Sequence, residues 1–169
     1  MKNLLNYSTI IKHLERKGWK RKNIKNPETV ASHSWHMAIL ALYLSKDYEK
    51  EYDFNKVINL CLCHDLAESI IGDITPNDDL YKNKKEIEKE AMKKIKEECN
   101  FDKVYDLFIE YEEKNTKEAK LANDLDQIDM YRQSLDYENK HKDKDLSEFR
   151  NSALNKLLTP LGRKIIDSL

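Results

Sequence analysis

The sequence predicts an all-α fold, a helical bundle formed by one domain that spans residues 1–169. Apolar residues recur at helical spacing along the whole chain, and no strand-like alternation persists anywhere. Charged residues make up 36% of the composition, and the chain contains only three glycines and three prolines. Such a composition suits long helices with solvated outer faces, and a chain of this length can bury a real core.

The first predicted helix begins near Leu4 and ends near Lys17-Gly18, where a glycine suits a helix C-terminus. A basic connector follows it over residues 19–27. Thr29 is the expected N-cap of the second helix, which continues to Leu42. The third helix contains an apolar run and the pair His64-Asp65, and we expect it to stop at Gly72.

Thr75 and Pro76 predict the next helix start, with threonine as the cap and proline at the first helical position. A narrow apolar stripe between residues 87 and 99 then marks one face of a charged helix. A shorter helix around residues 104–108 leads to a long one from about Glu118 to Tyr137. The C-terminal part is expected to pack back on the bundle.

Composition excludes several classes of function. With 30 basic and 31 acidic residues, the net charge of -1 gives no general attraction to nucleic acid or an anionic membrane. The apolar runs fall short of the roughly 20 residues that cross a bilayer, and the N-terminus lacks the apolar core of a signal peptide. We therefore expect a cytoplasmic protein with no membrane or nucleic-acid partner. Its three cysteines make no disulfide framework, and we expect Cys61 and Cys63 in the core.

The pair His64-Asp65 is the most informative local feature of the sequence. It follows an apolar run, residues 57–63, that predicts a buried helix. Two polar side chains at the inner end of a buried helix are costly unless they find strong partners, and a metal ion satisfies both together. Glu68 lies one turn further on, so its side chain can reach the same place. The alternative is a core histidine beside a helix-terminal aspartate.

A complete metal site needs ligands from other helices. His33 and His36 are three residues apart on the second predicted helix and can share a face. The long late helix offers three candidate aspartate ligands: Asp124, Asp126 and Asp129. All three flank the apolar stripe of that helix, so helical periodicity does not identify which one is the metal ligand. We expect two of these three aspartates to be surface charges.

Two longer strings carry a family resemblance. Residues 26–34 read Asn-Pro-Glu-Thr-Val-Ala-Ser-His-Ser, and residues 64–76 read His-Asp-Leu-Ala-Glu-Ser-Ile-Ile-Gly-Asp-Ile-Thr-Pro. A histidine, a later His-Asp pair and a distant aspartate resemble the pattern of the HD-domain metal-dependent phosphohydrolases. The two strings are similar to the signatures of the 5'-deoxynucleotidase, or YfbR-like, branch. The resemblance extends from Arg16 to about Tyr137.

The resemblance implies a role for each matching residue. His33, His64, Asp65 and Asp126 match the four metal ligands of the family. Glu68 matches its essential glutamate.

The remaining matches concern the substrate. Asp73 matches an active-site aspartate near the substrate, Arg16 a phosphate-contacting arginine, and Trp19 an aromatic packed against the nucleoside. Without the resemblance, these residues are equally well a turn cap, a solvated charge and a core aromatic. Asp124 is the less favoured alternative as the fourth ligand, and His36 departs from the family pattern and receives no role.

The resemblance implies an enzyme that hydrolyses the 5'-phosphate of deoxyribonucleoside monophosphates with one divalent metal ion. A mixed nitrogen and oxygen ligand set accepts Mn, Co, Fe, Ni or Zn, and disfavours Mg. The family also implies a homodimer. The alternatives are an HD-type phosphohydrolase acting on a nucleoside triphosphate, a cyclic dinucleotide or an alarmone, and a metal-stabilised scaffold without turnover. The basic connector would attract phosphate, and less plausibly RNA.

Overall fold

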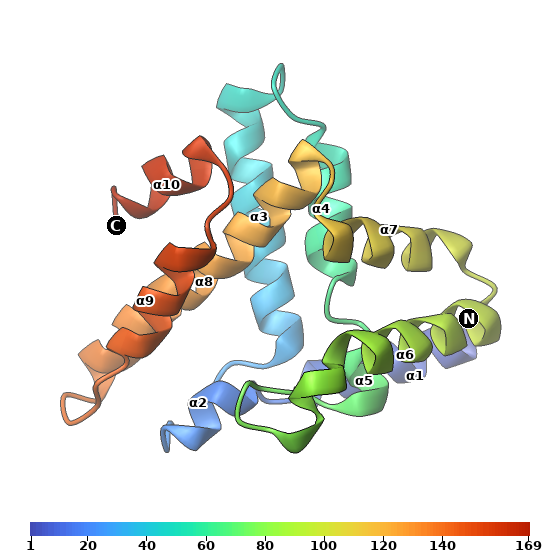
Figure 1. The fold of residues 1–169 in the computed structure, drawn as a ribbon, viewed down its shortest axis with the longest axis horizontal. Coiled ribbons are helices and arrows are strands. Elements are labelled where there is room, and N and C mark those ends of the chain that lie inside the picture. The colour runs from blue at the N-terminus through green and yellow to red at the C-terminus, as the bar shows by residue number, and fades with distance from the viewer.

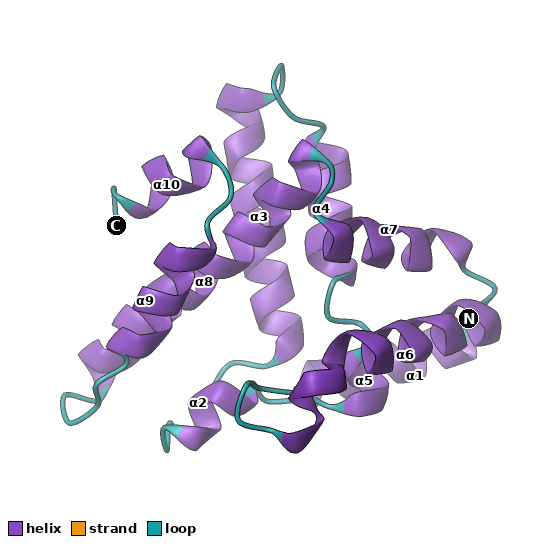
Figure 2. Ribbon diagram, in the orientation of Figure 1, coloured by secondary structure: helices purple, strands orange, loops and turns teal.

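The computed structural model describes residues 1–169, which form helices joined by short connections (Figure 1, Figure 2). In chain order, the elements are α1 (Lys2–His13), α2 (Lys17–Arg21), α3 (Val30–Tyr48), α4 (Phe54–Cys63), α5 (Glu68–Ile71), the 3-10 helix η1 (Asp79–Asn83), α6 (Lys84–Cys99), α7 (Asp102–Glu113), α8 (Lys117–Lys140), α9 (Ser147–Lys156) and α10 (Pro160–Ile166). The only β-type pairing is one isolated bridge, between Glu15 and Thr29. The all-α prediction is therefore confirmed. No helix is both long and apolar enough to span a membrane.

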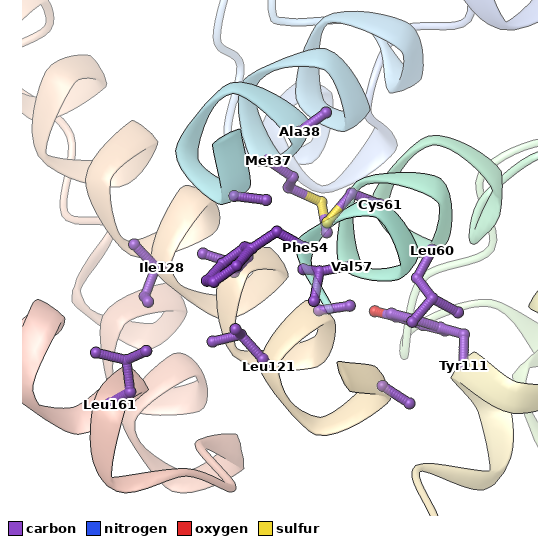
Figure 3. Packing of buried hydrophobic residues seen from close by; sticks show 14 of the residues in the cluster. Met37, Ala38, Phe54, Val57, Leu60, Cys61, Tyr111, Leu121, Ile128 and Leu161 are labelled. Carbon is purple, nitrogen blue, oxygen red and sulfur yellow. The ribbon is translucent and has the colours of Figure 1, made fainter. Parts of the chain in front are cut away.

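The main hydrophobic core lies where α3, α4 and α8 pack together in the middle of the molecule (Figure 1). Met37, Leu60 and Leu121 come from these three helices, are fully buried, and meet in the cluster that Figure 3 shows. A second cluster joins α1, α6 and α7, and includes Met92 from the predicted stripe of α6.

The start of α3 is fixed by a capping box. The side chain of Thr29 accepts a hydrogen bond from the Ser32 N–H (3.2 Å), and the Ser32 hydroxyl accepts one from the Thr29 N–H (2.9 Å). Each side chain satisfies a backbone donor that the first helical turn would otherwise leave unpaired. The prediction of Thr29 as the cap is confirmed, and His33 consequently sits in a fixed first turn.

The end predicted for the first helix is wrong. α1 ends at His13, not near Lys17-Gly18, and Gly18 lies inside α2. The residues after α1 are extended because their backbone pairs with the segment that precedes α3. In this pairing the Arg16 N–H donates to the carbonyl of Glu28 (3.0 Å). A partner distant in sequence thus ends the helix and brings Arg16 to the start of α3.

The predicted third helix is broken into two pieces. α4 ends at Cys63, and hydrogen bonds between residues three apart form a tight turn, in which the Glu68 N–H donates to the Asp65 carbonyl (3.1 Å). The separate helix α5 (Glu68–Ile71) is followed by its C-cap Gly72, whose φ of 76° suits glycine. The break changes the chain direction immediately after the His-Asp pair.

No helix begins at Thr75 and Pro76, which corrects a second sequence-based prediction. The carboxylate of Asp78 accepts hydrogen bonds from the backbone N–H and the hydroxyl of Thr75, both at 2.8 Å. These bonds close a turn before η1. The same carboxylate pairs with Arg21 of α2 (2.8 Å), so the turn is tied to α2.

The C-terminal helices pack against α8, as predicted, through a buried carboxylate (Figure 1). Asp124 is fully buried and accepts hydrogen bonds from the Leu158 N–H (2.7 Å), the Thr159 N–H (2.8 Å) and the Thr159 hydroxyl (2.7 Å). Gly162 lies against this carboxylate, and a Cβ added there would collide with it. Asp124 therefore anchors α10 to the bundle.

We expect Gly162→Ala to destabilise the protein by about 1–3 kcal/mol, the usual cost of forcing an extra methyl into a packed site. The Asp124 carboxylate has little freedom to move aside, because Leu158 and Thr159 both hold it. Urea unfolding at equal metal content measures the change. Lys164→Ala, on the exposed side of the same helix, is the control and should leave the midpoint unchanged.

Candidate metal centre

Two buried histidines face one another between α3 and the end of α4. The ring centroids of His33 and His64 are 5.5 Å apart. The Nδ1 atom of each ring has a partner: Asp129 Oδ2 lies 2.5 Å from that of His33, and the carbonyl of Cys61 lies 2.9 Å from that of His64. The two Nε2 atoms are buried and make no hydrogen bond of acceptable geometry, although an aspartate oxygen lies near each of them. Both rings therefore present an unsatisfied nitrogen to the same space.

Carboxylate oxygens complete this space. Asp126 Oδ1 lies 3.1 Å from His33 Nε2, and Asp65 Oδ2 lies 3.0 Å from His64 Nε2. Ligand atoms of His33, His64 and Asp126 all lie within 4.8 Å of one another. Asp65 sits beside His64, just outside that trio. The second oxygen of Asp126 accepts a hydrogen bond from the Tyr111 hydroxyl (3.3 Å), which helps to fix its orientation.

The donor set fits a divalent metal ion. A buried polar atom without a hydrogen bond destabilises the folded state. One metal ion bound by both Nε2 atoms would remove this cost for the two histidines together. Imidazole nitrogens with carboxylate oxygens are a common set for divalent transition metals. Burial opposes the charged form of His33, but the adjacent carboxylates of Asp126 and Asp129 outweigh it and raise the pKa of His33 to about 10. An ion must therefore displace a proton, and its affinity rises with pH.

Glu68 lies at the start of α5 with a free carboxylate oxygen. The side chain is only 2% exposed, and its Oε2 atom is buried without a hydrogen-bond partner. Its Oε1 atom lies 4.0 Å from the ammonium of Lys84. Burial, together with the nearby charges of Asp65 and Asp73, raises the pKa of Glu68 well above its usual value. A carboxyl group with a raised pKa is a candidate proton donor or acceptor.

Arg16 and Asp73 flank the site from the side of α2. Arg16 Nη1 lies 3.4 Å from Asp65 Oδ2, and Arg16 Nε lies 3.9 Å from Glu28 Oε1. Burial lowers the pKa of Arg16, but these carboxylates more than compensate, and the guanidinium stays charged. Asp73 Oδ2 accepts a hydrogen bond from the Lys17 N–H (2.6 Å). The structure thus brings Arg16 to the cluster and ties Asp73 to the first turn of α2.

Trp19 of α2 is buried, and its expected contact with the nucleoside stays a prediction. The side chain is 2% exposed, and its ring centroid lies 4.3 Å from that of Phe149 and 5.2 Å from that of Tyr137. Its indole N–H donates to Glu28 Oε1 (2.8 Å). The helical turn of α2 directs the indole inward, against Phe149 and Tyr137.

The two remaining aspartates of α8 are not surface charges, contrary to expectation, because Asp124 and Asp129 are fully buried. Asp129 accepts hydrogen bonds from both His33 and His36. Burial raises its pKa, but these bonds outweigh burial and lower the pKa of Asp129 to about 2. The sequence did contain a signal for this contact, since His33 and His36 share the three-residue spacing of Asp126 and Asp129.

We expect Asp129→Asn to weaken the affinity for Mn²⁺ or Co²⁺ by about 10–100-fold, because the carboxylate orients the ligating ring of His33. Calorimetric titration of chelator-stripped protein measures this affinity directly. Asp136→Asn is the matched control on the same helix, since Asp136 pairs with Arg132 at the surface (2.9 Å). Equal affinity in wild-type protein and Asp129→Asn would contradict the orienting role.

Comparisons with known proteins identify the family of this chain. A family model described as HD domain matches residues 9–163. The human protein named 5'-deoxynucleotidase HDDC2 is 35% identical over 164 residues, which cover 94% of this chain and 79% of that protein. The protein of the same name from Dictyostelium discoideum is 34% identical over 184 residues, with 98% and 95% covered.

A solved structure has the same fold over almost the entire chain. A conserved hypothetical protein from Pyrococcus furiosus matches with a TM-score of 0.87 and 34% identity, covering 99% of this chain and 98% of that one. The resemblance carried by residues 26–34 and 64–76 is thereby confirmed at the level of sequence and fold. The chain belongs to the HD-domain family, in the group whose curated members are named 5'-deoxynucleotidase.

Proposed function

We propose that residues 1–169 form one metal-dependent phosphohydrolase domain that removes the 5'-phosphate from deoxyribonucleoside monophosphates. The observation that carries the proposal is the buried group of His33, His64 and Asp126, whose ligand atoms all lie within 4.8 Å of one another. Glu68, whose pKa is raised by burial and by the nearby charge of Asp65, adds a buried carboxylate oxygen without a partner. The charged guanidinium of Arg16 also lies beside Asp65. Relatives named 5'-deoxynucleotidase, 32–37% identical over most of this chain, supply the substrate class.

His33, His64, Asp65 and Asp126 are the proposed metal ligands. Their mixed nitrogen and oxygen donors suit Mn, Co, Fe, Ni or Zn, and suit Mg less well. A divalent ion held there supplies Lewis-acid chemistry, which activates water and offsets the charge that develops on the phosphoryl group.

The other side chains act on the substrate and its protons. Arg16 can hold two phosphate oxygens through its planar guanidinium, a geometry that lysine does not offer. Glu68 exchanges a proton at its free Oε2, either with the attacking water or with the leaving 5'-oxygen. Asp73 borders the substrate and holds the start of α2, and with it the residue that follows Arg16. Trp19 is the proposed aromatic contact to the nucleoside, and its burial implies that only an edge of the indole would be reached.

A nucleotide panel tests the proposal. The panel contains deoxyribo- and ribonucleoside monophosphates, a triphosphate, a cyclic dinucleotide and an alarmone, each with Mn, Co, Mg or a chelator. We expect metal-dependent release of inorganic phosphate from the deoxynucleoside monophosphates. Pyrophosphate or a linear dinucleotide as product would favour the alternative substrates. Folded, metal-loaded protein that turns over nothing would favour the scaffold alternative.

We expect Glu68→Gln to keep its bound metal and lose turnover by at least about 100-fold, the usual scale of a lost acid-base group. The substitution preserves volume in a site that is 2% exposed, but it removes the ionisable oxygen. Turnover and metal content are measured on the same preparation. Glu86→Gln, an exposed glutamate of α6, is the control. Unchanged turnover in Glu68→Gln would exclude the proposed proton transfer.

A homodimer is also proposed, with α3 as its contact surface. This helix exposes four large apolar side chains that follow helical spacing and therefore form one apolar face. They are Trp35 (60% exposed), Ile39 (41%), Leu42 (57%) and Tyr43 (63%). Ile58 of α4 borders the same depression as Leu42. Exposed apolar patches of several hundred Å² are typical of interaction surfaces, and a second copy would cover this one. The expected cytoplasmic location and lack of a nucleic-acid partner stay predictions from composition.

We expect Leu42→Glu to convert the dimer into a monomer, because it buries a charge in the contact. Size-exclusion chromatography with light scattering measures the mass. Leu5→Glu is the matched control, since Leu5 is 59% exposed on α1, away from this face. A wild-type protein that is monomeric at all accessible concentrations would contradict the proposal.

A further inference from the structure

Lys84 places an ammonium group between two buried carboxylates. It is the first residue of α6, and its Nζ atom lies 3.4 Å from Glu88 Oε1 and 4.0 Å from Glu68 Oε1. α5 and α6 contact each other, and this pairing sets Lys84 beside the start of α5 (Figure 1). The lysine side chain is 26% exposed, whereas those of Glu68 and Glu88 are 2% and 7% exposed.

This arrangement differs from an ordinary ion pair along a helix surface. A solvated pair four residues apart contributes little, and its geometry is loose. Here burial raises the pKa of Glu88 to about 7, against the opposing effect of Lys84. The charges of Glu88, Asp65, Glu68 and Asp73 in turn raise the pKa of Lys84, although burial opposes this. The ammonium is thus held among the acidic groups of the site.

The two oxygens of Glu68 have different surroundings. Oε1 faces the Lys84 ammonium, while Oε2 is buried and has no partner. Arg16, the other nearby cation, is engaged with Asp65 and Glu28 and makes no ion pair with Glu68. Lys84 is therefore the group that can select which oxygen of Glu68 points into the site.

We propose that Lys84, held in place by Glu88, is a positioning residue that binds Glu68 Oε1 and so directs Oε2 toward the reacting groups. The proposal rests on the proposed function, in which Oε2 exchanges a proton with water or with the leaving oxygen. A carboxylate that loses this support is free to rotate, and a displacement of about 1 Å in a catalytic group can cost about 100-fold in rate. Positioning of this kind acts on kcat.

Steady-state kinetics of metal-saturated variants test the role. We expect Lys84→Met to lower kcat by about 10–100-fold with KM changed by less than about threefold, since the ground-state contacts to phosphate are kept. Lys84→Arg retains the cation and should recover kcat to within about threefold. Glu88→Gln should lower kcat less than Lys84→Met, because the lysine stays. Lys85→Met, at the exposed neighbouring position, is the control and should match wild type.

A second measurement reads the position of Glu68 without turnover. Crystal structures of metal-loaded wild type and Lys84→Met should differ in the direction of the Glu68 carboxyl group. An unmoved carboxyl group overturns the proposal, as does a raised KM with unchanged kcat, which would make Lys84 a phosphate contact. If Lys84→Met does not fold, the kinetic constants and the crystal structure of Glu88→Gln test the proposal instead. Wild-type protein inactive on every nucleotide refutes the proposed function, while the crystal structures still test the positioning.

Discussion

The buried contact between Asp129 of α8 and the Nδ1 atom of His33 on α3 is the interaction on which the site depends. It joins two of the three central helices and determines which ring nitrogen of His33 remains free. The capping box of Thr29 fixes the first turn of α3, and therefore the height of His33 along its helix. A helix end that frayed, or a carboxylate that rotated, would misdirect the ring, because each positions the same side chain.

Most other side chains of the site reach the space beside His33 because the helices next to them in sequence end nearby. The turn after α4 makes the side chains of His64 and Glu68 point in different directions. A continuous helix would have placed both side chains along one face. The backbone pairing beside Glu28 ends α1 early and delivers Arg16. Four segments distant in sequence thereby supply histidine, carboxylate and guanidinium groups to one buried space. Helices that pack as rigid elements hold such a group more accurately than loops do.

The site collects more negative than positive charge in a region shielded from water. Two basic side chains, those of Arg16 and Lys84, face the four acidic groups of the site. These groups are Asp65, Glu68, Asp73 and Asp126. A divalent cation would relieve this imbalance, whereas histidine ligands are neutral when they bind a metal. An ion bound only by the native state adds to stability as its concentration exceeds the dissociation constant. A metal ion at the proposed site would therefore couple metal binding to folding.

The sequence by itself determined the helical class, the cap of α3 and the two strings that carry the family resemblance. These follow from local rules, since apolar spacing and capping chemistry depend on neighbours within one turn. Only the tertiary structure decided the different uses of Asp124, Asp126 and Asp129, the inward direction of Trp19 and the early end of α1. Apolar periodicity predicts which face of a helix is buried. It does not predict which distant segment of the chain packs against that face. For the same reason Lys84 and Glu88 read as surface charges in the sequence and meet Glu68 only in the folded protein.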